Sequence, residues 1–145
     1  MTMHYLDLGD SGLGAESVET ALRKIENALA VTGDFSVHFV SDEEIRALNR
    51  EYRDKDEPTD ILTFAMKDGE DFIVPCEEEE DLGDFFISLD SMRRNASEFG
   101  VPEEEELDRL LLDGVLHLLG YDHQSNDFST EPMLVKQEIL MKDLF

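Results

Sequence analysis

Three side chains in the last third of the chain have the types and the spacing of a metal site. Asp113 and His117 stand four positions apart, and His123 follows six positions later. Residues i and i+4 lie on one face of a helix, so the carboxylate and the first imidazole would point to one place. Gly120 lies between the histidines and readily takes the left-handed conformation that ends a helix. The pattern predicts three ligands with a fourth position open, as in catalytic metal sites.

The same residues also fit a structural interpretation, in which His117 packs among leucines and Asp113 pairs locally. The spacing further equals that of zinc proteases, His-Glu-x-x-His-x-x-Gly-x-x-His, where the glutamate is the general base. Here the residue after Asp113 is Gly114, which carries no side chain. The chain therefore lacks the protease's general base, and the spacing alone leaves a metal site and a structural histidine both open.

A long helix is expected to carry Asp113 and His117. Pro102 followed by Glu103–Glu106 is typical of a helix start, because proline fits the first turn and carboxylates favour the positive end of the helix dipole. Apolar residues then recur at helical spacing and predict one buried face: Leu107, Leu110, Leu111, Val115, Leu116 and Leu119.

The other segments predict a small sheet beside helices. Alternating or apolar runs indicate strands at 3–8, 35–40, 61–66 and 85–89, and helical spacing indicates helices from 15 to before 33, from 41 to 52, at 91–99 and at 132–144. Residues 53–60 are expected to form a loop. Residues 67–82 are expected to be an acidic, solvated insertion, since they include an unbroken acidic run at 77–81. The pattern predicts one mixed α+β domain over 1–145 rather than a doubly wound sheet.

Composition limits the class of protein further. With 12 basic and 36 acidic residues, the formal net charge is −24, which disfavours non-specific binding to nucleic acid or to anionic membranes. The single cysteine, Cys76, excludes an internal disulfide. The first ten residues lack the features of a signal peptide, and no apolar stretch approaches transmembrane length. We expect a cytoplasmic protein.

Longer motifs add a family resemblance. The stretch Gly114–His123, Gly-Val-Leu-His-Leu-Leu-Gly-Tyr-Asp-His, resembles the signature of the YbeY family of bacterial endoribonucleases, His-Gly-x-Leu-His-Leu-x-Gly-Tyr-Asp-His. Leu48–Arg53 resembles the family's Leu-Asn-x-x-Tyr-Arg block, and Pro58–Phe64 resembles its Pro-Thr-Asp-Val-Leu-Ser-Phe block. Leu82–Asp84 resembles its Leu-Gly-Asp block, so the resemblance spans about residues 35 to 123.

The resemblance implies a fold, an activity and partners. It implies an α+β domain with a mostly four-stranded mixed sheet surrounded by helices. It implies one divalent ion, expected to be Zn2+, held by three histidines, and a catalytic arginine near the metal that corresponds to Arg53. It implies a single-strand-specific endoribonuclease that acts in maturation of small-subunit ribosomal RNA and in ribosome quality control. The expected partners are ribosomal RNA and the small ribosomal subunit, with a basic ribosomal protein as a further candidate and no membrane.

One position departs from the family pattern, because Asp113 stands where the family has its first histidine. Aspartate ligates zinc through oxygen, so Asp113, His117 and His123 remain a chemically reasonable set of metal ligands. The carboxylate's charge would acidify a bound water less, and its oxygen shifts metal preference toward Mn2+, with Ni2+ a further alternative to Zn2+. Two other functions stay open: a metal-dependent hydrolase of another substrate, and a ribosome-associated assembly factor with weak or no nuclease activity.

An acidic ribonuclease needs local basic groups to approach RNA. Arg46, Arg50 and Arg53 are spaced for one helix face, and Arg93 with Arg94 form a second group. The alternative is that these arginines pair with nearby carboxylates on a solvated surface. We expect a neutral or positive channel that leads to the metal ligands on an otherwise negative surface.

Overall fold

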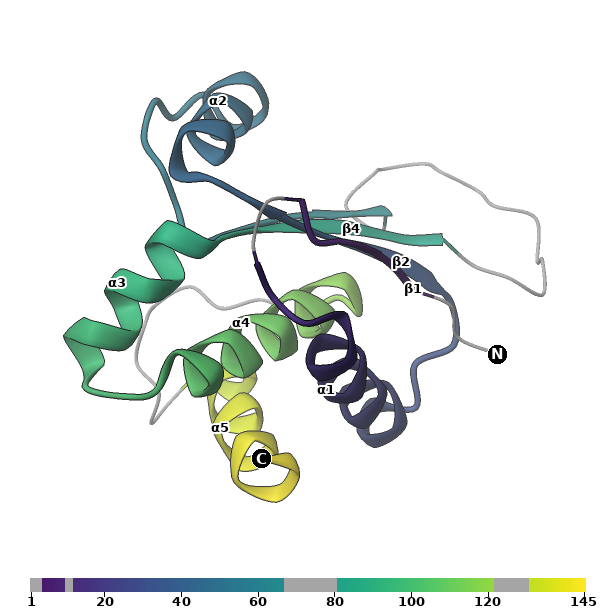
Figure 1. Cartoon of the computed structure of the whole chain (residues 1–145). Helices are drawn as coiled ribbons and strands as arrows, with labels where there is room; N and C mark the ends of the chain where they lie inside the picture. Colours follow the sequence, from purple (N-terminus) through teal and green to yellow (C-terminus); the bar gives the residue numbers. More distant parts are fainter. Residues whose placement is uncertain (1–3, 10–11, 67–80, 122–130) are drawn as a thin grey trace.

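A computed structural model of the chain describes residues 4–9, 12–66, 81–121 and 131–145 (Figure 1). Within these ranges the elements follow one another as β1 (His4–Asp7), α1 (Ala15–Leu29), β2 (Asp34–Val40), α2 (Asp42–Arg53), β3 (Ile61–Ala65), β4 (Asp81–Ser88), α3 (Leu89–Phe99), α4 (Glu103–Leu118) and α5 (Pro132–Leu144). None of the helices found there is both long enough and apolar enough to span a bilayer.

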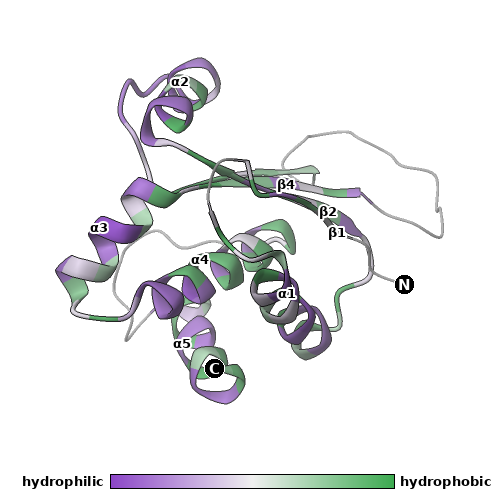
Figure 2. Ribbon diagram, viewed as in Figure 1, coloured by the Kyte–Doolittle hydropathy of each residue, from purple (hydrophilic) through white to green (hydrophobic). Residues whose placement is uncertain are grey.

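A mixed sheet organises these elements, with strand order β1-β2-β4-β3. β1, β2 and β4 run parallel, and β3 pairs antiparallel with β4. α1 and α4 cover one face of the sheet, α5 packs on α4, and α2 lies on the other side (Figure 1). The apolar sides of α1 and α4 turn toward the sheet (Figure 2). The predicted α+β domain with a four-stranded mixed sheet is confirmed.

α4 is the central helix of the domain. It packs against the sheet and against α1, α3 and α5, so residues on most of its circumference are buried. Leu111, Leu112, Val115, Leu116 and Leu118 are all 0% exposed. Burial of a leucine or valine side chain is worth about 1.5–3 kcal/mol, so the helix that carries Asp113 and His117 is anchored by several such terms.

A glycine lets α4 approach the sheet closely. Gly114 is buried and faces Phe85 of β4, and a Cβ at this position would lie 2.6 Å from the Phe85 ring. Carbon atoms in contact are normally about 3.5–4.0 Å apart, so no larger residue fits without a shift of the helix or the ring. The absence of a side chain after Asp113 therefore has a packing cause, independent of catalysis.

Replacing Gly114 with alanine should destabilise the protein by about 1–3 kcal/mol, the usual range for overpacking a dense core. Alanine favours helix over glycine by about 1 kcal/mol, so the contact with Phe85 must outweigh a gain in helix propensity. Gly14→Ala, at the N-cap of α1, is a control for the steric contact alone, because a Cβ at Gly14 would meet nothing within 4 Å. Chemical denaturation of both variants measures the effect, and a Gly114→Ala variant as stable as the parent would contradict this packing.

A β-bulge shapes the start of β4. Asp34 of β2 pairs with Asp81, whereas Phe35 pairs with Gly83, so Leu82 is an extra residue in β4. The extra residue changes which side chains face inward, and Leu82 is 2% exposed although it stands three positions before the buried Phe85. The expected boundary of the acidic insertion was therefore wrong at its end, because Asp81 and Leu82 belong to the sheet. Residues 67–80 lie outside the described residues.

The start of α2 is fixed by a dense set of polar contacts. Ser41 caps the helix in the predicted capping box with Glu44. The Asp42 carboxylate accepts hydrogen bonds of 2.6 Å from the hydroxyls of both Ser88 and Ser91 and pairs with Arg94 at 2.7 Å. Burial raises the pKa of Asp42, but these hydrogen bonds and the arginine together lower it to about 2. They hold α2 against the start of α3 and so fix the helix that ends with Arg53.

Candidate functional site

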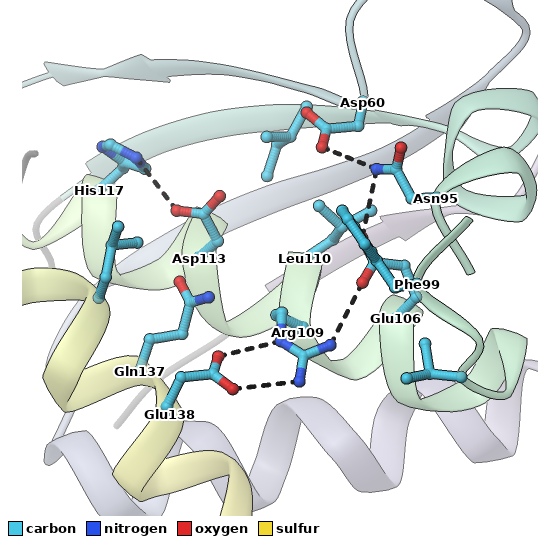
Figure 3. Close-up of a pocket in the computed structure, with 13 residues that line it drawn as sticks. Asp60, Asn95, Phe99, Glu106, Arg109, Leu110, Asp113, His117, Gln137 and Glu138 are labelled. Carbon is cyan, nitrogen blue, oxygen red and sulfur yellow. Dashed lines mark hydrogen bonds and ion pairs between the residues drawn. The ribbon is translucent and has the colours of Figure 1, made fainter. Parts of the chain in front are cut away.

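Asp113 and His117 lie side by side on the last turns of α4. His117 Nε2 is 3.1 Å from Asp113 Oδ1, and the two side chains are 23% and 17% exposed (Figure 3). The contact is close but not aligned as a hydrogen bond, because the buried Asp113 Oδ1 accepts none from the described residues. The i, i+4 pairing predicted from the sequence thus brings a carboxylate oxygen and an imidazole nitrogen to one point.

α4 ends directly after His117, as Gly120 predicted. Gly120 has φ 100° and donates its N–H to the carbonyl of His117, and Tyr121 donates to the carbonyl of Leu116, both at 3.0 Å. These two bonds form a Schellman motif, which turns the chain away from the helix axis. His123, the third predicted ligand, lies outside the described residues. No group of three or more potential metal ligands forms among the residues that are described, so the three-ligand set stays a prediction.

Arg53 reaches the same region from α2. Its Nη2 donates a 2.7 Å hydrogen bond to the carbonyl of Thr63, and its guanidinium lies over the Phe64 ring, 5.0 Å from the centroid. Arg53 and His117 both line a hollow of about 500 Å³, together with Gly120. Arg53 and His117 are far apart in the sequence, and the fold brings both to the wall of one opening.

A larger cavity of about 710 Å³ adjoins this hollow, and His117 and Ile61 line both spaces. Its walls come from the end of the loop before β3 and from α3, α4 and α5. The polar side chains in these walls, besides Asp113 and His117, are those of Asp60, Asn95, Glu106, Arg109, Gln137 and Glu138. None of these six was predicted as a site residue, although Glu106, Arg109 and Asp113 follow helical spacing on one face of α4.

Five polar side chains in the wall of the cavity form one connected network, which extends from Asp60 to Glu138 (Figure 3). Asn95 Nδ2 donates to Asp60 Oδ2 at 3.0 Å and to Glu106 Oε2 at 3.3 Å. Arg109 donates to Glu106 at 3.3 Å and to both oxygens of Glu138 at 3.0 and 3.2 Å. Burial raises the pKa of Glu106, and burial followed by the charge of Asp113 raises the pKa of Asp60. The wall holds more carboxylates than cations.

Most arginines of the expected basic channel are paired with carboxylates. Arg46 forms a two-pronged contact with Asp56 at 2.9 and 3.2 Å. Arg93 pairs with Glu103 at 3.1 Å, and Arg94 pairs with Asp42 as described above. These pairs follow the alternative interpretation of a solvated, paired surface. Arg53 is the member of the set that lines the hollow beside His117.

Asp113 and His117 carry donor atoms that suit a divalent transition metal. A buried carboxylate oxygen without a hydrogen bond is poorly solvated, and a cation would satisfy it. Imidazole nitrogen and carboxylate oxygen are both zinc ligands, and mixed oxygen and nitrogen sets also suit Mn2+. Asp113 and His117 are therefore suited to share one ion.

Known proteins resemble this chain over most of its length. The family model described as Endoribonuclease YbeY matches residues 12–144. The endoribonucleases YbeY of Bacillus cereus (strain ATCC 10987 / NRS 248) and of Bacillus anthracis (strain A0248) are each 43% identical over 122 residues, which cover 82% of this chain and 76% of the relative.

A solved structure agrees with these sequence matches. The solution structure of TM1509 from Thermotoga maritima matches with a TM-score of 0.65 and 29% identity, over 99% of this chain and 89% of that one. The extent of the family match and the identity to its members are both high. The chain therefore belongs to the endoribonuclease YbeY family.

Proposed function

We propose that this chain, an endoribonuclease by its family membership, cuts single-stranded ribosomal RNA with the help of one divalent ion held by Asp113, His117 and His123. The observation that carries the proposal is the buried Oδ1 of Asp113, which has no hydrogen-bond partner among the described residues and lies 3.1 Å from Nε2 of His117. His117 in turn lines one opening together with Arg53. We further propose that it acts in the cytoplasm, in small-subunit rRNA maturation and ribosome quality control.

The bound ion and Arg53 would have different roles in RNA cleavage. The bound ion would supply Lewis-acid polarisation of the phosphate and activation of water. Among the described residues, Arg53 uses one of its five N–H donors, on Thr63, which leaves the others to bind a phosphate and to stabilise the charge that develops on it. The hydrogen bond to Thr63 and the Phe64 ring hold the guanidinium in place before RNA binds.

A direct test combines metal analysis with RNA cleavage. We expect about one equivalent of a divalent ion in the purified protein, loss of cleavage with a chelator, and faster cleavage of a single-stranded RNA than of the same sequence in a duplex. Less than about a tenth of an equivalent of any transition metal after reconstitution would instead indicate an assembly factor without nuclease activity. Metal without cleavage of single-stranded RNA would indicate a hydrolase of another substrate.

Asp113→His tests the departure from the family pattern. If Asp113 is a ligand, the added imidazole should raise zinc affinity by about tenfold or more. The reason is that zinc binds imidazole nitrogen in preference to carboxylate oxygen. Asp113→Asn is the matched control, which keeps the shape but loses the anionic oxygen, and it should lower zinc affinity. Competition with a zinc-binding dye measures both variants. Unchanged zinc affinity in both would show that Asp113 does not touch the metal.

A further inference from the structure

The side chains that line the larger cavity include acceptor oxygens and apolar groups that neither a metal ion nor a phosphate would use. We propose that it binds one nucleobase of the RNA beside the scissile phosphate, and that it favours bases with an exocyclic amino group over uracil. That the base belongs to RNA rests on the proposed function. The site itself stands on the residues that line the cavity.

The size and the apolar walls of the cavity suit a planar base. Its volume of about 710 Å³ falls within the range of about 300–1,000 Å³ that is usual for small-molecule sites. Ile61, Leu110 and Leu134 form apolar parts of the wall. Phe99 lines the cavity and is 63% exposed, so its ring offers a free surface on which a base can stack.

Two residues that line the cavity each have a buried oxygen without a hydrogen-bond partner among the described residues. Among the described residues, the buried side-chain oxygens and nitrogens without a partner are Asp113 Oδ1 and Gln137 Oε1, and both residues line this cavity. Gln137 is only 3% exposed, and its amide reaches from α5 toward Asp113 (Figure 3). A metal ion would satisfy Asp113. Gln137 Oε1 then remains as a buried acceptor that a donor on a ligand would satisfy.

The donors in the wall are largely committed to neighbouring carboxylates. Asn95 directs its amide nitrogen to Asp60 and Glu106, and Arg109 directs its guanidinium to Glu106 and Glu138. What the wall offers to a ligand is therefore an excess of acceptor oxygens and negative charge. A phosphate would be repelled, whereas a neutral base that presents N–H groups would be bound.

The amino group distinguishes the bases. Adenine, cytosine and guanine each carry an exocyclic amine with N–H donors, which match carboxylate and amide oxygens. Uracil has a carbonyl oxygen, O4, where cytosine has its amine, so that oxygen would face other acceptors without a partner, and only the N3–H of uracil remains as a donor on this edge. A site that hydrogen-bonds one group discriminates strongly against an analogue that lacks it, so we expect at least about tenfold weaker binding of uracil.

Cytidine and uridine are the matched probes, because they differ only in the amine or carbonyl at C4 and in the proton on N3. Titration of each nucleoside into the metal-loaded protein, followed by NMR of the labelled Gln137 side-chain amide, should show at least about tenfold tighter binding of cytidine. Gln137→Met keeps the size of the side chain and removes the acceptor, so cytidine should lose most of this advantage. Phe99→Ala, at an exposed position, should weaken both nucleosides equally.

Two results would overturn the base site: equal binding of cytidine and uridine to the parent protein, or unchanged discrimination in folded Gln137→Met. A cleavage assay separates this outcome from failure of the proposed function, using an oligouridine that holds one cytosine. Cleavage that is focused next to the cytosine supports the site. Cleavage at all positions equally refutes it while leaving the nuclease intact, and discrimination between nucleosides without any RNA cleavage would keep the site and refute the proposed function.

Discussion

Replacing His117 with alanine should abolish RNA cleavage and metal binding together. The substitution removes the imidazole that faces Asp113 and lines both hollows. Loss of groups that merely support a metal ligand costs about 10- to 100-fold, so loss of a ligand should lower kcat/KM by about a thousandfold or more. The side chain is 23% exposed near the end of α4, so the stability of the metal-free protein should change by no more than about 1 kcal/mol. Metal content, kcat/KM and thermal unfolding of the metal-free forms are the measurements.

Arg53→Ala is the companion variant, because Arg53 lines the same hollow but is not a predicted ligand. It should keep the metal and lose cleavage by about a hundredfold or more, the usual effect of removing one group that stabilises developing charge. A His117→Ala variant that retains stoichiometric metal would rule out His117 as a ligand. Equal loss of metal in both variants would point to general damage of the site.

Gly83→Ala should be among the most damaging substitutions in the sheet, with a loss of about 3 kcal/mol or more in the free energy of unfolding. Gly83 has φ 117°, and a Cβ there would collide with the carbonyl oxygen of Phe64 on the neighbouring strand. A backbone oxygen within the β3–β4 pairing cannot move aside as a side chain can. Urea denaturation of the purified variant measures the loss, and poor soluble expression would accompany it.

Gly100→Ala separates the two causes of that loss, which are the strained backbone conformation and the collision with Phe64. Gly100 also has a positive φ, 68°, but a Cβ there would meet nothing within 4 Å. Its replacement should therefore cost only the backbone term, about 1 kcal/mol. Equal losses at the two glycines would mean that the close approach of β3 and β4 does not contribute.

Local signals in the sequence were enough to predict most helices. α5 spans Pro132–Leu144, the range predicted for it, and the capping box at Ser41 opens α2 as expected. Such signals act within a few residues, so they can be read without knowledge of the fold. The bulge at Leu82 could not be read in this way, because it exists only through pairing with β2, which is distant in the sequence. The alternation after the bulge suggested a strand that began at Phe85, four residues late.

The candidate site likewise has one part that the sequence predicts and another that only the fold creates. The pairing of Asp113 with His117 follows from helix geometry, whereas the position of Arg53 followed from the family resemblance. The large cavity was not foreseen at all. Its polar wall joins Asp60, Asn95 and Gln137, which come from separate elements and carry no common spacing. Such a site is a property of tertiary packing.

The contact between Gly114 and Phe85 also limits what this fold can become. A zinc protease with the same ligand spacing needs a glutamate at position 114, and the Phe85 ring occupies the space into which its first carbon would project. A single substitution to glutamate would break the packing of α4 on β4 before it could create a general base. Two or more coordinated changes, with a smaller residue at position 85 among them, would have to arise together. The path from this candidate site to a protease of that kind therefore passes through unstable intermediates.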